Sequence, residues 1–350
     1  MKTYKKLFEA IIAPENLFAA WDRFKQGKRG KPDVQEFERY LEQNIFKLYR
    51  ELRDRTYKHD TYASFYIQDP KQRHIHKASV RDRVVHHAVF RIINPLFEPT
   101  FISHSFSCRV EKGTHKGVAA MEKMIRQVSR NYSGKCFVLK CDIRSFFESI
   151  DHDTLVMILR KKVRDEEALW LIEEIIKSHY SKRLSLFNFK GLPIGNLTSQ
   201  LFANIYLNEF DQFVKQKLAI KHYARYTDDF VIVSESEEQL ERLIPPIRVF
   251  LQEKLSLDLH PGKVSIAKIR RGIDFLGFVS FPHHRLLRTK TKVRMFRKLR
   301  NRVREYNEGK IEEEKLGQVL QSYLGVLSHA NTEQLRKELL NMFWFLRETT

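Results

Sequence analysis

The alternation of hydrophobic and polar positions predicts a chain of mixed helices and strands. Over residues 34–57, apolar positions recur at three- and four-residue steps, which is typical of an amphipathic helix. From Lys135 the patterns predict a strand in "KCFVLKCDI", helices over about 153–178, a hairpin near 183–190 and a helix over about 197–217. Two β-prone runs, "HYARY" and "FVIVS", then flank residues 227–229. A helix opened by Ser236, with Gln239 at the capping-box spacing, and strands around 264–268 and 274–279 follow.

Without residues 183–217, this order is β-α-β-β-α-β. That is the split βαβ, or ferredoxin-like, order, in which the first strand lies beside the central hairpin in one antiparallel sheet. In "FVLKCDI", Val138, Lys140 and Asp142 share one strand face, and the alternate residues point into the core. We therefore expect an α+β protein in which Asp142 reaches the surface that carries Asp228 and Asp229 at the hairpin tip.

The composition points to a basic globular protein. Of the 350 residues, 42% are hydrophobic and 30% are charged, and the net charge of +20 favours nucleic acid as the partner. No run of about 18 apolar residues could cross a bilayer, and "MKTYKKLFEA" lacks the apolar core of a secretory signal, so we expect a cytoplasmic protein of a bacterial host without a membrane partner. The three cysteines lack C-x-x-C spacing, which argues against disulfides and a zinc site.

Three converging carboxylates would need a multivalent cation, because without a basic partner they raise one another's pKa. Oxygen ligands suit Mg²⁺, and two such ions about 3.5–4 Å apart can activate a hydroxyl and neutralise a leaving pyrophosphate. The competing interpretation is an ordinary turn at Thr227 and Asp228 and a strand-end cap at Asp142. The strongly β-prone flanks favour the metal site, since a tight hairpin fixes where both aspartates point.

Other residues have a functional and a plain interpretation. Phe147 could close off the space beside a sugar and exclude a ribose 2′-hydroxyl, or it could be a core residue. The basic stretch from Lys71 could hold a triphosphate or be a solvated face. Lys263 could reach a pyrophosphate or lie on the surface. His74, His76, His86 and His87 lack zinc-type partners and favour packing or phosphate contacts over a metal site.

Five motifs follow one another along the chain: "LKCDIRSFFESIDH", "GLPIGNLTSQLFANIYLNEFD", "YTDD", "LDLHPGKVSI" and "IDFLGF". In this order they resemble the palm motifs of reverse transcriptases, and "RHIHKASVRDRVVHHAV" resembles their fingers. The resemblance covers roughly residues 65–280. It implies a right-hand polymerase with fingers, a ferredoxin-like βαββαβ palm and a helical thumb. It also implies that the chain copies template RNA from a primer into cDNA by two-metal nucleotidyl transfer.

The resemblance assigns roles to single residues. It implies that Asp142 and Asp228 bind two Mg²⁺ ions with the Ile143 carbonyl, that Mn²⁺ can substitute, and that Asp229 completes the acidic cluster. The residues implied at the incoming dNTP are Lys71, Arg73, Phe147 as the steric gate, Ile194, Gly195, and Lys263 near the pyrophosphate. The residues implied in the primer grip are Phe275, Leu276, Gly277 and Phe278.

The details favour one branch of the family. Group II intron enzymes and many relatives carry glutamine and proline where this chain has Ile194 and Gln200. "IGNLTSQ", with "DRVVHHAV" and "SHSFSCRVEKGTH", resembles reverse transcriptases of diversity-generating retroelements, which make errors at template adenines and act with a small basic accessory variability protein. An apolar side chain in place of the amide would reduce the difference between correct and incorrect base pairs by about 1 kcal/mol, so fidelity should fall. Thr227 stands where alanine or methionine is more usual.

Leu287 to Lys310 form a predicted basic helix with ten Lys and Arg residues against two glutamates, suited to gripping phosphate backbones. Its expected nucleic-acid contacts are Arg288, Lys292, Arg297, Lys298 and Arg302. Helices around 312–328 and 332–347 would complete a thumb, and we expect no endonuclease, ribonuclease H or separate maturase domain after it. The predicted division is an N-terminal extension and fingers over 1–134, a palm over 135–286 with an insertion near 179–195, and a thumb over 287–350.

Two other functions stay open. A retron or phage-defence reverse transcriptase would share the same chemistry, and neighbouring genes would separate it from a diversity-generating enzyme. A polymerase-shaped RNA-binding scaffold without turnover is the alternative from another class. The presence of all three aspartates argues against the scaffold, because it would have no need of a costly acidic cluster.

Overall fold

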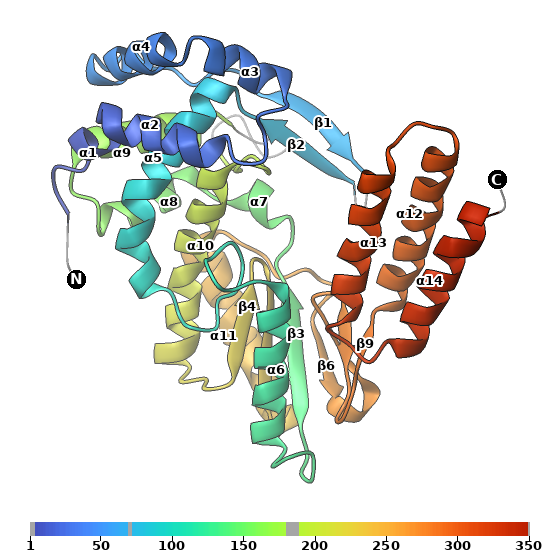
Figure 1. Ribbon diagram of the computed structural model, residues 1–350. Helices are drawn as coiled ribbons and strands as arrows, with labels where there is room; N and C mark the ends of the chain where they lie inside the picture. Colours follow the sequence, from blue (N-terminus) through green and yellow to red (C-terminus); the bar gives the residue numbers. More distant parts are fainter. Residues whose placement is uncertain (1–3, 69–71, 180–188, 349–350) are drawn as a thin grey trace.

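The computed structural model describes residues 4–68, 72–179 and 189–348 (Figure 1). Its N-terminal part is helical and packs around the long helix α5, which contacts α1, α2, α3 and α10. The helices of this part are α1 (Phe8–Ile12), α2 (Pro14–Phe24), α3 (Pro32–Arg39), α4 (Leu41–Arg53), α5 (Val80–Phe97) and η1 (Glu98–Thr100). The next helix along the chain, α6 (Thr114–Val128), packs against the central sheet instead. Within the described ranges, no helix has the combined length and apolar character that crossing a bilayer requires.

A two-stranded hairpin projects from this helical part. β1 (Ala63–Ile67) pairs antiparallel with β2 (Arg73–Lys77), and all five side chains of β1 are exposed. The base of the hairpin is fixed from the side, because the His76 amide donates to the Ile194 carbonyl at 3.2 Å and the Asn196 side-chain amide donates to the His76 carbonyl at 3.1 Å.

A four-stranded antiparallel sheet lies at the centre of the molecule. Its strands are β3 (Phe137–Asp142), β4 (Tyr223–Tyr226), β5 (Asp229–Ser234) and β6 (Ser265–Lys268), in the order β4-β5-β3-β6. The connecting helices are α7 (Phe146–Ser149), α8 (His152–Arg160), α9 (Glu166–Lys177), α10 (Leu197–Gln212), the π-helical turn η2 (Phe213–Lys217) and α11 (Glu237–Leu255). This strand order is the split βαβ topology that the sequence predicts.

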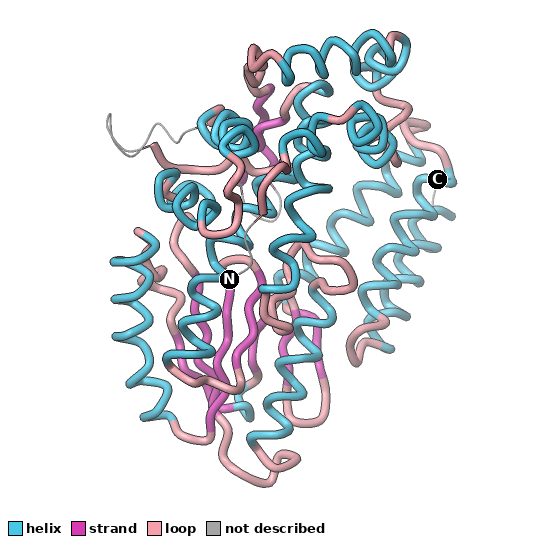
Figure 2. Tube along the Cα trace, turned by 90° about the vertical axis from the view of Figure 1, so that its left-hand side faces the viewer, coloured by secondary structure: helices cyan, strands magenta, loops and turns pink. Residues whose placement is uncertain are grey.

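The two faces of the sheet pack against different elements, as Figure 2 shows. Phe137, Leu139 and Cys141 share one core cluster with side chains of α10 and α11. Val138 points the other way, into a second cluster that includes side chains of α6. The period-2 alternation predicted for β3 is therefore confirmed, and its second face is covered by protein up to the end of the strand.

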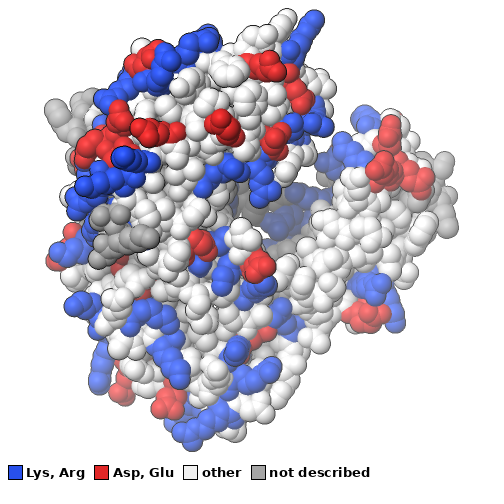
Figure 3. Space-filling model, turned by 60° about the vertical axis from the view of Figure 1, so that its left-hand side comes forward, with Lys and Arg blue, Asp and Glu red and all other residues white. Residues whose placement is uncertain are grey.

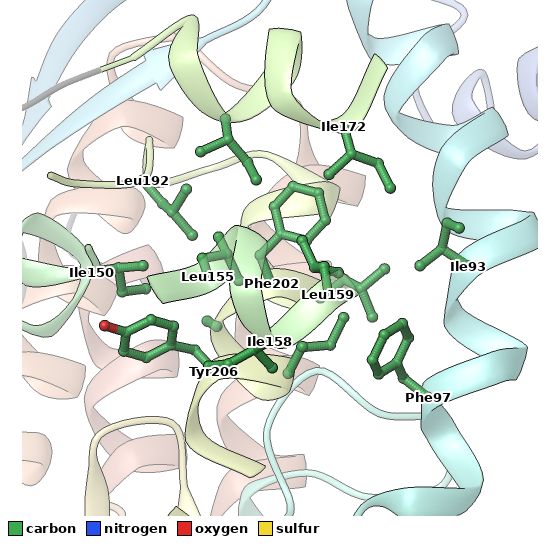
Figure 4. Packing of buried hydrophobic residues seen from close by; sticks show 14 of the residues in the cluster. Ile93, Phe97, Ile150, Leu155, Ile158, Leu159, Ile172, Leu192, Phe202 and Tyr206 are labelled. Atoms are coloured by element: carbon green, nitrogen blue, oxygen red, sulfur yellow. The ribbon is translucent and has the colours of Figure 1, made fainter. Parts of the chain in front are cut away.

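The first cluster continues behind the loops that lead to α7 and α10, and Figure 4 shows this packing. Leu155 and Leu159 of α8 lie among side chains of α5, α9 and α10. Ile150 enters the same cluster from the link between α7 and α8, and Leu192 enters it from the loop that leads to α10. Burial of these two residues anchors α7, which carries Phe147, and the loop that carries Ile194, since close-packed cores tolerate little displacement.

The C-terminal part has its own small sheet and three helices, which stand beside the rest of the molecule in Figure 1. After η3 (Ile269–Arg271) come β7 (Ile273–Phe275), β8 (Phe278–Ser280) and β9 (Arg285–Leu287), paired in that order, and then α12 (Thr289–Asn307), α13 (Glu313–Leu327) and α14 (Glu333–Glu348). The predicted strand around 274–279 is wrong as one strand, because Leu276 and Gly277 both have positive φ and turn the chain back into a hairpin. The division predicted after residue 286 falls inside β9.

Two further predictions need correction. The helix predicted over 34–57 is broken at Tyr40, where φ is −122° and ψ is 40°, and the Asn44 side-chain amide donates to the freed Phe37 carbonyl at 3.1 Å. Ser236 does cap α11 by accepting from the Gln239 amide, but the Gln239 side chain accepts from Ser234 instead of returning to the cap. Most of the hairpin predicted near 183–190 lies outside the described residues.

Candidate active site

The three predicted catalytic aspartates come together at one end of the central sheet. Asp142 ends β3 and lies directly opposite Asp229, which begins β5. Asp228 occupies the two-residue turn between β4 and β5, and its carbonyl accepts from the Ile143 amide at 3.2 Å. The backbone register therefore places the carboxylate-bearing turn beside the end of β3, as the sequence predicts.

Burial and mutual repulsion perturb the pair in the turn. Burial, together with the negative charges of Asp229 and Asp142, raises the pKa of Asp228 to about 6. Burial also raises the pKa of Asp229. The positive charge of Lys140 lowers this pKa, and the negative charge of Asp142 raises it further. Asp142 itself is only 8% exposed. Carboxylates that are costly to ionise at one spot are typical of sites that take a cation.

A lysine already neutralises one of the three aspartates. The Lys263 ammonium donates to Asp142 Oδ1 at 2.7 Å, and the His260 amide donates to the Asp142 carbonyl at 2.8 Å. The expectation that the aspartates converge without a basic partner is therefore wrong. The ammonium is drawn to the most buried carboxylate because it offsets part of the cost of removing that charge from water.

A metal site can be tested against this geometry. Over residues 4–68, 72–179 and 189–348, no three Asp, Glu, His or Cys side chains are grouped so as to hold an ion. Within these ranges, the four histidines of the basic stretch belong to no such group. The donor set at the sheet end still fits Mg²⁺ in its chemistry, since carboxylate oxygens under mutual repulsion are hard anionic ligands. Asp142 would have to exchange the Lys263 ammonium for the ion.

The residues predicted at the dNTP lie on segments that are tied together. Phe147 of α7 is half-buried, packs edge-on against Phe146, and its carbonyl accepts from the Leu192 amide at 2.7 Å. The Ile194 carbonyl accepts a hydrogen bond from the His76 amide of the β1–β2 hairpin. The neighbouring Gly195 has φ of +113°, and the Ile75 side chain packs against it. A side chain at that glycine would be strained.

The remaining predicted residues fall in several places. Arg73 is exposed at the start of β2, Lys71 lies outside the described residues, and Gln200 is on the first turns of α10. Phe275 and Phe278 are buried on either side of the Leu276–Gly277 turn, and the Gly277 carbonyl accepts from the Arg288 amide at 3.0 Å. The "FLGF" motif is therefore a tight hairpin tied to the start of α12.

The basic helix α12 buries Met295, Leu299 and Val303 and exposes most of its charged residues. Arg297 and Lys298 are exposed. Three of the predicted contacts pair with acidic side chains: Arg288 with Asp274, Lys292 with Glu338 and Arg302 with Glu305. Figure 3 shows Lys and Arg side chains on both sides of a hollow beside the C-terminal helices. Its surface suits a polyanion.

The sequence analysis missed a buried ion pair behind the aspartate turn. Arg225 of β4 and Asp211 of α10 are both fully buried, and the arginine donates from Nε to Oδ1 at 2.8 Å and from Nη2 to Oδ2 at 2.6 Å. Arg225 Nη1 also donates to the Thr227 carbonyl at 3.1 Å. The available signals were a charged residue within a β-prone run and an aspartate within an otherwise apolar helix.

Comparison with known proteins agrees with this geometry. The model of the family described as "Reverse transcriptase (RNA-dependent DNA polymerase)" matches residues 58–280, which is more than half of the chain. Protein YkfC of Escherichia coli is 27% identical over 61% of this chain and 63% of its own length. The group II intron-encoded protein LtrA of Lactococcus lactis subsp. cremoris is 23% identical over 79% of this chain and 57% of its own.

The chain thus spans about three fifths of the length of these two curated relatives. A protein of a cob intron in Schizosaccharomyces pombe is 28% identical over a shorter stretch, 39% of this chain and 16% of its own length. The matched family segment contains β2, the whole central sheet, the three aspartates and the "FLGF" hairpin. The chain belongs to the reverse transcriptase (RNA-dependent DNA polymerase) family.

Proposed function

We propose that this chain is an RNA-directed DNA polymerase that extends a primer on template RNA with dNTPs. The observation that carries the proposal is the register of β3 and β5, which sets Asp142 opposite Asp229 and beside the turn with Asp228. Three aspartates presented at one end of this sheet supply carboxylate ligands of the kind that two-metal nucleotidyl transfer uses. Membership of the reverse transcriptase family supports the same activity.

Two Mg²⁺ ions, or Mn²⁺ in their place, would be held by Asp142, Asp228 and the Ile143 carbonyl, with Asp229 completing the cluster. When bound, such ions lower the pKa of the attacking 3′-hydroxyl and neutralise the leaving pyrophosphate. Lys263, which donates to Asp142 in this structure, would yield that carboxylate to a bound cation and would then be available as a charge partner for the leaving pyrophosphate.

The residues around this cluster would select the substrate. Arg73, with Lys71, neutralises the triphosphate charge that the cations leave uncompensated. The Phe147 ring blocks a ribose 2′-hydroxyl, which would lose water and gain no partner. Ile194 and Gly195 would line the nascent base pair. Because the Ile194 carbonyl accepts from His76 and Gly195 lies against Ile75, the position of the β1–β2 hairpin becomes part of substrate selection.

In this proposal the described parts act as fingers, palm and thumb. The helical N-terminal part with the β1–β2 hairpin corresponds to fingers over 1–134, the central sheet to a palm over 135–286, and α12 to α14 to a thumb over 287–350. The "FLGF" hairpin acts as the primer grip between the last two. The exposed cations of α12 hold the RNA/cDNA duplex by its phosphates.

The finer assignment rests on residues rather than on overall similarity. "IGNLTSQ", with Ile194 and Gln200, supports error-prone cDNA synthesis for mutagenic retrohoming in a diversity-generating retroelement, together with a small basic accessory variability protein. The name of LtrA favours an intron-type reverse transcriptase as the second candidate. Sequencing of cDNA made on a defined RNA separates the two, because errors concentrated at template adenines are expected only for the first. Ile194→Gln should lower that error rate, and an unchanged error spectrum would refute the role of Ile194.

The activity itself is tested by primer extension with dNTPs and Mg²⁺. We expect extension by the wild-type chain and its loss in Asp228→Asn, which keeps the shape of the side chain but removes a charged ligand. Asp153→Asn, at an exposed residue of α8, is the matched control and should extend normally. Equal extension by wild type and Asp228→Asn would refute the metal assignment. Binding of RNA without any extension would favour the non-catalytic scaffold.

A further inference from the structure

The turn that carries Asp228 is held in an unfavourable backbone conformation. Thr227 has φ of +52°, in the left-handed region that β-branched residues rarely adopt. Tyr226 and Asp229 pair directly across the hairpin, so Thr227 and Asp228 form its whole loop. A conformation of this kind persists only where surrounding contacts impose it.

Two contacts from outside the hairpin fix Thr227. Its carbonyl accepts from Arg225 Nη1 at 3.1 Å, and its hydroxyl donates to Ser107 Oγ at 2.6 Å. Both partners are buried, with Arg225 fully so and Ser107 at 3% exposure. The two atoms of Thr227 that can form hydrogen bonds on this side are thus both engaged by groups that solvent does not reach.

Arg225 is itself fixed by several partners. Asp211 of α10 binds its Nε and Nη2, and the Ser105 hydroxyl accepts from Nη2 at 3.1 Å. The Tyr223 hydroxyl donates to Asp211 Oδ1 at 2.7 Å, which holds the carboxylate in place. A guanidinium bound on several sides in a fixed plane can present one donor accurately to a backbone carbonyl.

Ser107 is held in place because its own segment, residues 104–107, pairs with the outer edge of β4. The Arg225 amide donates to the His104 carbonyl and the Phe106 amide donates to the Arg225 carbonyl, both at 2.9 Å. The Asn204 side-chain amide of α10 donates to the Ser107 carbonyl at 2.9 Å. The edge of β4 is therefore covered, and the serine hydroxyl is presented to the turn by two separate elements.

We propose that Arg225 and Ser107 are positioning residues that hold the Thr227–Asp228 turn so that the Asp228 carboxylate can share a divalent cation with Asp142. The inference rests on the proposed function, because it concerns how the aspartates meet the cation. An ion pair that served only to stabilise the fold would not need a third donor aimed at the turn. Partners that orient a ligand typically change metal affinity by 10- to 100-fold when they are removed.

The test measures Mn²⁺ binding to the full chain in the absence of nucleic acid and dNTP. The electron paramagnetic resonance signal of free Mn²⁺ reports how much of the ion is bound. Arg225→Lys keeps a positive charge beside Asp211 but cannot reach Ser105 and Thr227 together. We expect its Mn²⁺ dissociation constant to rise by about 10-fold. In primer extension, the half-saturating Mg²⁺ concentration should rise in parallel, and excess Mg²⁺ should restore much of the rate.

A matched control separates positioning from stability. Arg285 also joins a carboxylate, that of Glu122, to a backbone carbonyl, that of His329, but touches no residue of the turn. Arg285→Lys should lower the melting temperature as Arg225→Lys does and leave Mn²⁺ binding unchanged. Ser107→Ala provides a second variant with the ion pair intact, and it should weaken Mn²⁺ binding with little change in melting temperature.

The outcomes are distinguishable. Unchanged Mn²⁺ binding in both Arg225→Lys and Ser107→Ala, in a chain whose Asp228→Asn variant loses the site, would overturn the positioning roles alone. Identical binding by wild type and Asp228→Asn would remove the metal site, and with it both the proposed function and this inference. Weaker binding in the two variants but not in Arg285→Lys supports it.

Discussion

A substitution at Gly117 of α6 should alter primer binding although no residue of the proposed primer grip is replaced. A Cβ added there would lie 2.9 Å from Leu276 Cδ1 and 3.5 Å from Phe106 Cγ. Leu276 sits at the tip of the "FLGF" hairpin with φ of +50°. Gly117→Ala therefore pushes directly on the side chain at the centre of the proposed primer grip.

The effect on stability can be worked out from two opposing contributions. In the interior of a helix, alanine is favoured over glycine by about 0.5–1 kcal/mol. Overpacking costs about 1–3 kcal/mol, and the lower end applies because the contact is with the flexible end of a leucine. We expect Gly117→Ala to change the free energy of unfolding by less than about 1 kcal/mol. Gly317→Ala in α13, where nothing lies within 4 Å of the added Cβ, should stabilise by about 0.5–1 kcal/mol.

The assay combines urea denaturation with steady-state primer extension. A shift of the hairpin that costs about 1 kcal/mol in primer contact should raise the KM for primer–template by about fivefold and leave the KM for dNTP unchanged. In a Leu276→Ala chain, from which the clash is absent, adding Gly117→Ala should stabilise the chain by the helix contribution alone. The reasoning is refuted if Gly117→Ala stabilises as much as Gly317→Ala and leaves primer binding intact.

Three other predictions follow from the same structure. Phe147→Val should admit ribonucleotides, since the lost discrimination of about 1–3 kcal/mol corresponds to roughly 5- to 150-fold in the ratio of kcat/KM for dNTP and rNTP, and retained discrimination would assign the gate elsewhere. Arg297→Gln and Lys298→Gln on α12 should each reduce the slope of log affinity for an RNA/DNA duplex against log salt by about 1, and an unaltered slope would show that this face does not meet phosphate. Burial lowers the pKa of His87 from 6.5 to about 4, with Lys28 adding to the effect. Because the unfolded chain then binds more protons, the free energy of unfolding should fall by up to about 3 kcal/mol as the pH drops from 6.5 to 4. His87→Gln should flatten that dependence in urea melts at several pH values, whereas an unaltered dependence would assign it to other groups.

The parts of the fold that could be predicted are those in which one residue period decides the structure. The alternation in "FVLKCDI" fixed which side chains of β3 enter the core, and the β-prone runs around "YTDD" fixed the hairpin. The break at Tyr40 and the separate sheet β7–β9 were missed for a local reason. In each case a few backbone angles end an element, joined at Tyr40 by one side-chain hydrogen bond, and these local features do not interrupt the hydrophobic pattern.

The candidate site divides in the same way. The aspartates could be found because two of them are adjacent in sequence and the third ends a strand whose pairing follows from the topology. Lys263 could be found as a lysine after a Pro-Gly turn, but its contact with Asp142 could not, since 121 residues separate the two. The contact forms because β6 pairs with β3, and the loop before β6 thereby places Lys263 beside Asp142.

Lys263 and Arg225 act on the aspartates in different ways, and the difference follows from their burial. The Lys263 side chain is 36% exposed and donates to Asp142, so a multivalent cation can replace its ammonium there. Arg225 is fully buried behind the turn, and removing it would leave Asp211 as an unpaired charge in the core. A cation that enters the cluster therefore competes with Lys263 and not with Arg225. The lysine can balance charge while the site is open, whereas the arginine keeps the turn in place in both states.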